Sequence, residues 1–448
     1  MPRLTLIYPS IGHDSKKGYV RSWQMQPLAM AVLAGLTPKE WEISFFDDRI
    51  EEVDDSIPAD LVAISVETFT ARRGYQLASR FRNRGVPVIM GGYHATFRPE
   101  EVLKYSDSVC IGEAEPVWKK ILEDVESKKL QKTYRGAQGF QLSGIRPDRS
   151  IFKGKKYFNL ALVESGRGCR GSCEFCSISA FYGSCHRRRP VSEVIDELRG
   201  LAGKPVFFVD DNLVGDGHMA REFFRELKPL GIRWVSQASL QHLENEDLVS
   251  DMAASGCAGL LVGFESLENS NLQSMGKSCN HVEDYGRTIG LLRRHGISLY
   301  GTFMVGYPYD SQELIDETVR FAETHKFYLA AFNHVVPFPG TDLYRRLSSE
   351  NRFSEKEWWL GKYRFGQVPF NPEKFSGEKI EKFCHQARKS FYSTFSILKR
   401  AKDLRANCRS FRKACAFFTI NFLLQKEVSQ KQGYPLGNPA EDEPRPIM

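Results

Sequence analysis

Short apolar runs alternate with segments of helical periodicity over the first 126 residues. The apolar runs have the length and composition of strands and lie at residues 4–8, 43–46, 61–66, 88–90 and 108–111. Segments with the spacing of amphipathic helices lie between or after them, at residues 26–36, 71–84, 99–105 and 114–126. This alternation predicts an α/β domain with a parallel, Rossmann-like sheet over residues 1–126.

A second alternation of strand-like and helix-length segments covers residues 158–345. Its six strand-like segments lie at residues 159–164, 206–209, 234–238, 259–263, 299–305 and 331–336. Six such units in succession predict a closed or partial barrel rather than a second doubly wound sheet. Barrels of this kind carry their chemistry at the C-terminal ends of the strands, so we expect the functional residues there.

The remaining segments lack this alternation. Residues 127–157 are polar and are interpreted as a linker, and residues 346–432 as a mainly helical C-terminal region. The last residues, 433–448, carry four prolines and three acids with almost no apolar period, so we expect them to be disordered.

The C-terminal region is rich in aromatic and basic residues. An aromatic segment is formed by Trp358, Trp359, Tyr363 and Phe365. It could close over an apolar substrate, but such aromatics are more typical of a core. Residues 388–413 hold nine basic residues and one acidic residue, whereas the whole chain has a net charge of +7. This run is more typical of a solvated helix face than of a nucleic-acid or membrane surface.

Composition favours an ordinary globular protein. Hydrophobic residues make up 42% of the chain and charged residues 26%. The sequence lacks a secretory signal and any apolar run long enough to cross a bilayer, so we expect a cytoplasmic location. Ten cysteines could suggest disulfides, but three of them fall within eight residues, which argues for metal instead.

The three crowded cysteines, Cys169, Cys173 and Cys176, have the spacing C-x3-C-x2-C directly after the first barrel strand. Thiolates hold iron–sulfur clusters, and three on one short loop can reach three of the four irons of a cubane. The glycines of the loop allow the backbone angles that such a wrap needs. A fourth iron is then open to a ligand, as in a catalytic metal site. Alternatively, Cys185 or His186 could complete a closed zinc site.

This loop resembles that of the radical S-adenosylmethionine (SAM) superfamily. The resemblance implies a [4Fe–4S] cluster that chelates SAM at its open iron and cleaves it reductively to a 5′-deoxyadenosyl radical. It also implies an electron donor such as flavodoxin or ferredoxin, and it places Phe175 beside the adenine of SAM.

Polar residues near the ends of the predicted barrel strands are further candidates for cofactor contacts. By the same resemblance Glu265 would meet the ribose of SAM. Asp210 and Asn212 follow the second strand and Gln237 lies on the third, where they could bind SAM or substrate. Asp and Asn at such positions are equally typical of helix caps.

The N-terminal domain is similar to the cobalamin-binding module of the B12-dependent radical SAM class. The resembling segments are residues 46–49, 68–73, 91–94 and 112–115. It implies a flavodoxin-like, B12-binding type of sheet ahead of a partial (β/α)6 barrel. It also predicts cobalamin contacts at Ser65, Thr68, Gly91 and Gly92, with His94 in a loop near the cofactor.

One departure from cobalamin proteins bears on the cofactor. The chain lacks the Asp-x-His-x-x-Gly motif that supplies a histidine to cobalt, so cobalamin would bind without one, or the domain could have lost the cofactor.

The leading functional hypothesis is a cobalamin-dependent radical SAM methyltransferase that acts on an unactivated carbon of a small molecule or lipid. One alternative is a cobalamin-independent radical SAM enzyme that catalyses a rearrangement, a cyclisation or the transfer of another SAM-derived group. Another is a non-catalytic metal module that binds nucleic acid. We expect no nucleic-acid partner, and the sequence identifies neither the catalytic residues, the substrate nor the oligomeric state.

Overall fold

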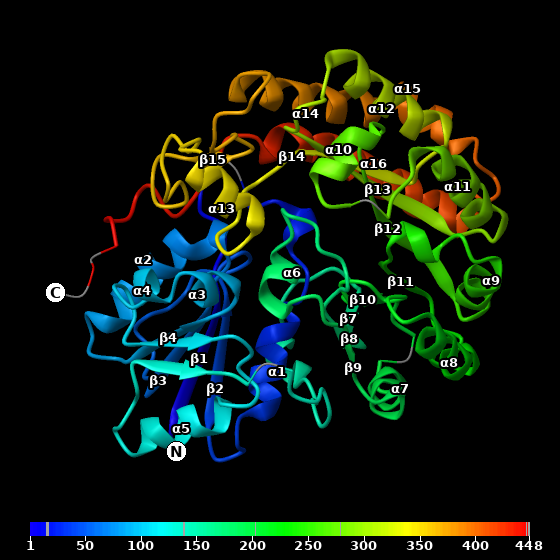
Figure 1. Ribbon diagram of the computed structural model, residues 1–448. Helices are drawn as coiled ribbons and strands as arrows, with labels where there is room; N and C mark the ends of the chain where they lie inside the picture. Colours follow the sequence, from blue (N-terminus) through cyan, green and yellow to red (C-terminus); the bar gives the residue numbers. More distant parts are fainter. Residues whose placement is uncertain (15–17, 138, 202, 278, 445, 447–448) are drawn as a thin grey trace.

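The computed structural model describes all residues except 15–17, 138, 202, 278, 445 and 447–448. Two parallel six-stranded sheets lie side by side, with α6 (Ser177–Tyr182) between them (Figure 1). The chain therefore has the two α/β domains that the two alternations predicted.

The N-terminal sheet has the strand order β2-β1-β3-β4-β5-β6. Its strands are β1 (Arg3–Tyr8), β2 (Glu42–Asp47), β3 (Leu61–Ser65), β4 (Val88–Gly91), β5 (Ser108–Ile111) and β6 (Thr133–Arg135). The first five follow the flavodoxin-like order 2-1-3-4-5, which confirms the predicted type of sheet. The helices of this domain are α1 (Leu28–Leu36), α2 (Ala71–Arg82), α3 (Tyr93–Phe97), α4 (Pro99–Val102) and α5 (Trp118–Glu126).

The sixth strand corrects the predicted domain boundary. β6 lies inside the predicted linker and pairs with β5, from Val109 opposite Thr133 to Ile111 opposite Arg135. Only Tyr134 of its three residues is buried, so the strand has too little apolar pattern to be recognised in the sequence.

The second sheet is a partial barrel with the order β14-β13-β12-β11-β10-β7. Its strands are β7 (Ala161–Val163), β10 (Val206–Phe208), β11 (Trp234–Gln237), β12 (Cys257–Glu265), β13 (Ser298–Val305) and β14 (Leu329–His334). The helices around it are α7 (Val191–Arg199), α8 (Gly217–Leu227), α9 (Glu246–Ala254), α10 (Asn269–Ser274), α11 (Tyr285–Arg294) and α12 (Gln312–Thr324). β7 and β14 are the two edges of this sheet, so the barrel is open, as expected.

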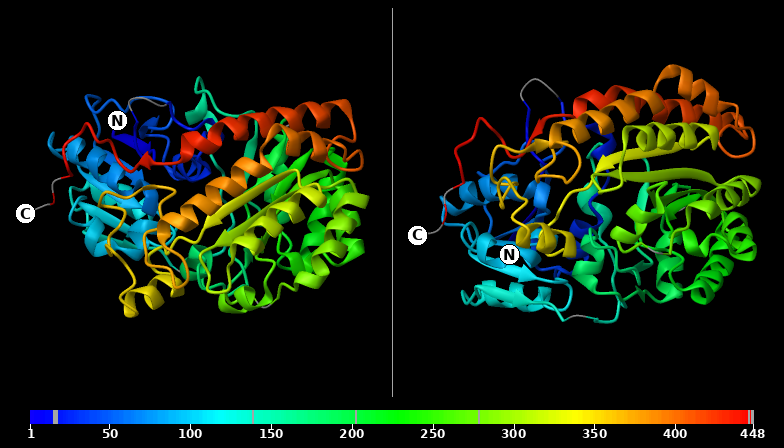
Figure 2. Two further views of the ribbon diagram at one scale, coloured as in Figure 1. Left: turned by 90° about the horizontal axis from the view of Figure 1, so that it is seen from above. Right: turned by 45° about the horizontal axis from the view of Figure 1, so that its top comes forward.

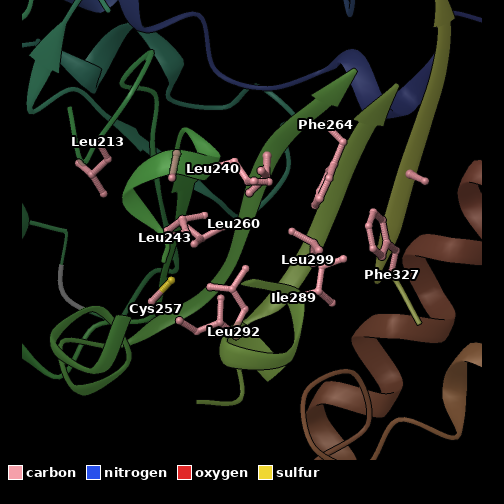
Figure 3. Packing of buried hydrophobic residues seen from close by; sticks show 14 of the residues in the cluster. Leu213, Leu240, Leu243, Cys257, Leu260, Phe264, Ile289, Leu292, Leu299 and Phe327 are labelled. Atoms are coloured by element: carbon pink, nitrogen blue, oxygen red, sulfur yellow. The ribbon is translucent and has the colours of Figure 1, made fainter. Parts of the chain in front are cut away.

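Buried apolar side chains hold the barrel strands against the surrounding helices (Figure 3). Gly301 of β13 illustrates how tight this packing is, because a Cβ there would lie 2.2 Å from the ring of Phe327 and 3.3 Å from that of Phe264. Any larger residue at position 301 would displace the Phe327 ring, so this glycine serves the core.

The C-terminal region is helical, as predicted. It comprises α13 (Asp342–Ser349), α14 (Gly377–Phe391), α15 (Thr394–Ala401) and α16 (Phe411–Lys431), with the short paired strands β15 (Arg364–Phe365) and β16 (Tyr434–Pro435). Trp358, Trp359 and Tyr363 are buried in a core cluster of the N-terminal domain. The core interpretation of these aromatics is thus confirmed. No helix in the described ranges has the length and apolar character needed to span a bilayer.

Short 3-10 helices and a hairpin complete the chain. The 3-10 helices are η1 (Arg21–Trp23), η2 (Thr68–Thr70), η3 (Arg149–Phe152), η4 (Lys228–Leu230), η5 (Leu240–His242) and η6 (Val282–Asp284). The hairpin pairs β8 (Gly166–Arg167) with β9 (Arg187–Arg188) and encloses α6.

The expectation of disorder after residue 432 is wrong for residues 433–444. Tyr434 and Leu436 are 1% and 3% exposed, and Gly437 donates its N–H to the carbonyl of Ile11 at 2.8 Å. Glu441 pairs with the buried Arg73 at 2.6 Å. The composition of this segment suggested disorder, but two apolar anchors and a cation on α2 fix it along the N-terminal domain.

Candidate active site

The cysteine loop is pinned to the end of the neighbouring strand. Gly168 adopts a φ of +87°, and a Cβ there would lie 2.0 Å from the carbonyl oxygen of Cys185. Its N–H donates to Asp211 Oδ2 at 2.8 Å. Only glycine fits this turn, which starts the loop that carries Cys169, Cys173 and Cys176.

The three thiols are partly exposed and free. Gly171 lies among them, since a Cβ there would be 3.5 Å from the sulfur of Cys169 and 4.0 Å from that of Cys173. Burial raises the pKa of both thiols, that of Cys173 to about 11, although the charge of Lys277 opposes the shift at Cys173. Metal binding would reverse these shifts, because a coordinated thiol loses its proton.

The arrangement of the thiols suits a cluster better than a single ion. Within the residues that the structure describes, no three His, Cys, Asp or Glu side chains converge closely enough to hold one metal ion. Cys185 is exposed, and the zinc alternative finds no four-ligand site here. Three thiols on one glycine-bearing loop are the ligand set that a cubane with one open iron needs, and their binding of a cluster stays a prediction.

The segment between the second and third cysteines is clamped by other elements. Glu174 donates its N–H to the carbonyl of Met275, and its carboxylate accepts from Tyr307 Oη at 3.0 Å and from Arg346 Nη2 at 2.8 Å. Phe175 packs against a group of buried apolar residues that includes Met275 and Tyr307, the two residues that contact Glu174. Its contact with adenine stays a prediction.

Glu265 ends β12 in a left-handed backbone conformation with a φ of +65°. Its Oε1 pairs with Lys277 Nζ at 2.5 Å, and both groups lie over Gly263, where a Cβ would be 2.2 Å from Glu265 Oε1. Such backbone strain in a non-glycine residue clusters at functional sites. The contact of Glu265 with ribose stays a prediction. No motif in the sequence identifies Lys277 as a partner of Glu265.

Asp210 and Asn212 have structural partners. Asp210 is fully buried and accepts from the N–H and Oγ of Ser165, at 2.8 and 2.6 Å. Burial raises the pKa of Asp210 to about 7. Asn212 donates from Nδ2 to Ser239 Oγ at 2.7 Å and accepts from the Ser239 N–H at 3.2 Å. Neither contact is a helix cap, since Asp216 is the N-cap of α8, and a contact of Asp210 or Asn212 with SAM stays a prediction. Gln237 ends β11 on the face opposite Trp234, and Trp234 stacks on Phe224 of the outer helix α8, so Gln237 is on the inner face of the barrel.

A cavity of about 540 Å³ separates the C-terminal edge of the N-terminal sheet from the barrel. Ser65, Gly91 and Gly92 line it from the sheet side, and their contact with cobalamin stays a prediction. Phe181 and Tyr182 of α6 line it from the cluster side. The cavity therefore touches both the sheet edge and the helix that follows Cys176.

Thr68 and His94 do not line this cavity. His94 is buried in α3 rather than in a loop, with its Nε2 3.1 Å from Glu101 Oε1 and its Nδ1 3.3 Å from Thr68 Oγ1. Its ring also packs against Trp359. The aromatic residues from the C-terminal region complete this core, and a sequence without contact information cannot reveal them.

Arg167 was not predicted and lies on the cavity wall. It donates to Glu113 at 2.8 Å, to Glu115 at 2.6 Å and to Glu164 at 2.8 Å. Arg187 also pairs with Glu113, at 2.9 Å. This network joins the N-terminal sheet to the cysteine hairpin. The only trace of this network in the sequence is the pair of acidic residues, Glu113 and Glu115, that follows Gly112 at the end of β5.

The comparisons with known proteins agree with this geometry. Residues 163–322 match the model of the radical SAM superfamily. The chain is 28% identical to bacteriochlorophyllide d C-12(1)-methyltransferase of Chlorobaculum tepidum over 416 residues, which cover 89% of this chain and 88% of that protein.

Two solved structures share the fold. TsrM from Kitasatospora setae, a radical SAM methyltransferase with cobalamin and a [4Fe–4S] cluster bound, has a TM-score of 0.62 and 16% identity, covering 78% of this chain and 75% of that chain. OxsB, a cobalamin-dependent radical SAM enzyme, has a TM-score of 0.68 and 13% identity. The match covers 96% of this chain and 72% of the OxsB chain. The part of the chain with the cysteine loop and the partial barrel, residues 163–322, therefore matches the radical SAM superfamily, and with the preceding flavodoxin-like sheet the chain shares the fold of these two structures.

Proposed function

We propose that this protein is a cobalamin-dependent radical SAM methyltransferase that methylates an unactivated carbon of a small molecule or lipid. One observation carries the proposal: a single cavity is lined by the glycines at the end of β4 and by the helix that begins after the third cluster cysteine. A cofactor held in this cavity would lie against the helix that directly follows the cysteine loop.

The residues around the cavity fit a large planar cofactor on the sheet edge. Gly92 has a φ of +100° and Gly91 carries no side chain, so the backbone after β4 leaves the sheet edge open. His94 is already bonded to Glu101, so it is not the ligand that would approach cobalt. Cobalamin would therefore bind without a histidine from this position.

The cofactors would supply the reactive chemistry, and this chain would hold and orient them. The cluster, when bound, supplies the electron that cleaves SAM to a 5′-deoxyadenosyl radical, and cobalamin supplies the methyl group. Cys169, Cys173 and Cys176 would hold the cluster, while the Glu265–Lys277 pair would hold polar groups of SAM at the end of β12. Phe181, Tyr182 and Trp118 would exclude water from the cavity.

The names of relatives support a carbon acceptor. The bacteriochlorophyllide methyltransferase carries a carbon position of its substrate in its name, and this chain covers most of its length. A flavodoxin or ferredoxin would supply the electron, and the protein would act in the cytoplasm.

The test is cobalamin retention after anaerobic purification, with two glycine variants. Gly91→Leu would fill the cavity, because a Cβ at Gly91 meets only Cys110, at 3.6 and 3.8 Å. Gly217→Leu is the control, since nothing lies within 4 Å of a Cβ there. We expect Gly91→Leu to lose the cobalamin absorption and keep the cluster, and Gly217→Leu to keep both.

A second measurement separates the alternatives. Formation of 5′-deoxyadenosine without cobalamin in the wild-type protein would favour a cobalamin-independent radical enzyme. A wild-type protein that neither forms 5′-deoxyadenosine nor retains cobalamin would favour a non-catalytic module. Cobalamin that is retained equally by both glycine variants would contradict the assigned cavity.

A further inference from the structure

Large apolar side chains gather on the outer side of the α15–α16 hairpin, residues 394–431. Phe395 and Phe411 are 78% and 84% exposed, and Leu398 and Leu404 are 53% and 72% exposed. In the described part of the chain eight large apolar side chains are exposed, and five of them, these four and Phe422, belong to this hairpin. Such a concentration is typical of an interaction surface.

The opposite side of the hairpin is fixed to the barrel. Ile397, Arg400 and Phe417 are fully buried, and Arg400 donates to the carbonyls of Phe327 and Tyr328, which directly precede β14. Lys413 Nζ donates to the carbonyl of Gly296 at 2.6 Å. The exposed residues therefore cannot turn inward without breaking these buried contacts. Figure 2 shows α14 to α16 running along the outside of the barrel domain.

The same stretch is strongly basic at its surface. Lys402, Arg405, Arg409 and Arg412 are exposed. The one acid between residues 388 and 413, Asp403, is 2% exposed and paired with Arg293 at 3.0 Å. The segment thus presents cations beside apolar side chains, with no exposed carboxylate of its own to neutralise them.

We propose that the outer side of the α15–α16 hairpin docks on an anionic lipid bilayer. Phenylalanine and leucine side chains gain free energy by entering the boundary between headgroups and acyl chains, and the flanking Lys and Arg side chains pair with anionic headgroups. The phosphates of a nucleic acid would pair with the Lys and Arg side chains, and its bases could stack on the phenylalanines. It would leave Leu398 and Leu404 without a partner, so the mixture favours a bilayer.

This surface leaves the cluster end of the barrel free. Lys413 of α16 contacts Gly296, which precedes β13, and Asn407 of the segment between α15 and α16 contacts Lys326, which precedes β14. The turn of the hairpin, where Leu404 and Phe411 are exposed, therefore lies at the N-terminal ends of these strands, opposite the ends that carry Glu265 and the cysteine loop. A protein bound in this way would keep its cavity and cysteine loop away from the lipid surface.

The test is co-sedimentation of the full-length protein with vesicles of phosphatidylcholine, alone or mixed with phosphatidylglycerol. We expect binding to the mixed vesicles that is about tenfold weaker for Leu404→Ser/Phe411→Ser, because two apolar side chains no longer enter the bilayer. Arg405→Gln/Arg412→Gln should weaken it similarly and reduce its dependence on salt. Met219→Ser is the matched control, because Met219 is 42% exposed on α8 and lies outside the hairpin.

The outcomes separate the candidate partners. All changed residues are exposed, so the thermal unfolding of each variant should match that of the wild type. Absence of binding to mixed vesicles, or binding that Leu404→Ser/Phe411→Ser leaves unchanged, would overturn the proposal. Tighter binding to single-stranded RNA than to mixed vesicles, lost in the arginine variant alone, would assign the surface to nucleic acid instead.

Discussion

Arg167 and Glu113 join the two domains through an ion pair with an Nη1–Oε1 distance of 2.8 Å, in which both side chains are less than a tenth exposed. Arg167 lies two residues before the first cluster cysteine, and Glu113 lies in the loop that follows β5. The position of the cysteine hairpin relative to the cavity thus depends on a buried charge network.

Replacement of Arg167 by Met should lower the free energy of unfolding by about 3–5 kcal/mol, because it leaves buried carboxylates without their cation. Chemical denaturation measures this change. Arg170→Met is the control, since Arg170 is 63% exposed and its contact with Asp216 is 3.5 Å long. Equal destabilisation by both variants would show that the network does not hold the domains together.

Lys277 should position Glu265 for SAM. Lys277→Met leaves the Glu265 carboxylate buried without its partner, and we expect the Kd for SAM to rise about tenfold, with partial rescue by Lys277→Arg. Calorimetric titration of reconstituted protein measures the affinity. An unchanged affinity in Lys277→Met would remove this pair from the SAM site.

Asp210 should make stability depend on pH. Burial raises the pKa of Asp210 from 3.8 to about 7, so the folded protein binds a proton that the unfolded chain releases between these values. Stability from this group is therefore present below about pH 4 and is lost as the pH rises to about 7.

Asp210→Asn tests this pH dependence, since asparagine resembles the neutral carboxyl and can keep both contacts with Ser165. The advantage of the variant over the wild type should grow between about pH 4 and pH 7, by about 2–4 kcal/mol at most. Denaturation curves at several pH values measure the difference. A constant difference across this range would contradict the raised pKa.

The C-terminal segment should stabilise the N-terminal domain. Leu436→Ala removes a side chain that is 3% exposed and should cost about 2–4 kcal/mol, whereas Leu398→Ala, at a 53% exposed position, should cost little. Thermal unfolding compares the two. A similar small effect of both would mean that residues 433–444 contribute little to stability.

Both sheets could be predicted from the sequence because long apolar runs such as residues 61–66 mark strands that are buried on both faces. β6 was missed because a three-residue edge strand carries almost no pattern. Cys169, Cys173 and Cys176 were recognisable from their spacing, the glycines between them and the strand that precedes them. Lys277, Arg167 and the buried role of His94 were not, since each depends on contacts with residues far away in the chain.

Iron, sulfide and zinc content after anaerobic reconstitution tests the cluster assignment most directly. We predict about four irons and four sulfides per chain in the wild type and in Cys185→Ala, and their loss in Cys176→Ala. Zinc in place of iron, lost in Cys185→Ala, would contradict a cluster held by Cys169, Cys173 and Cys176.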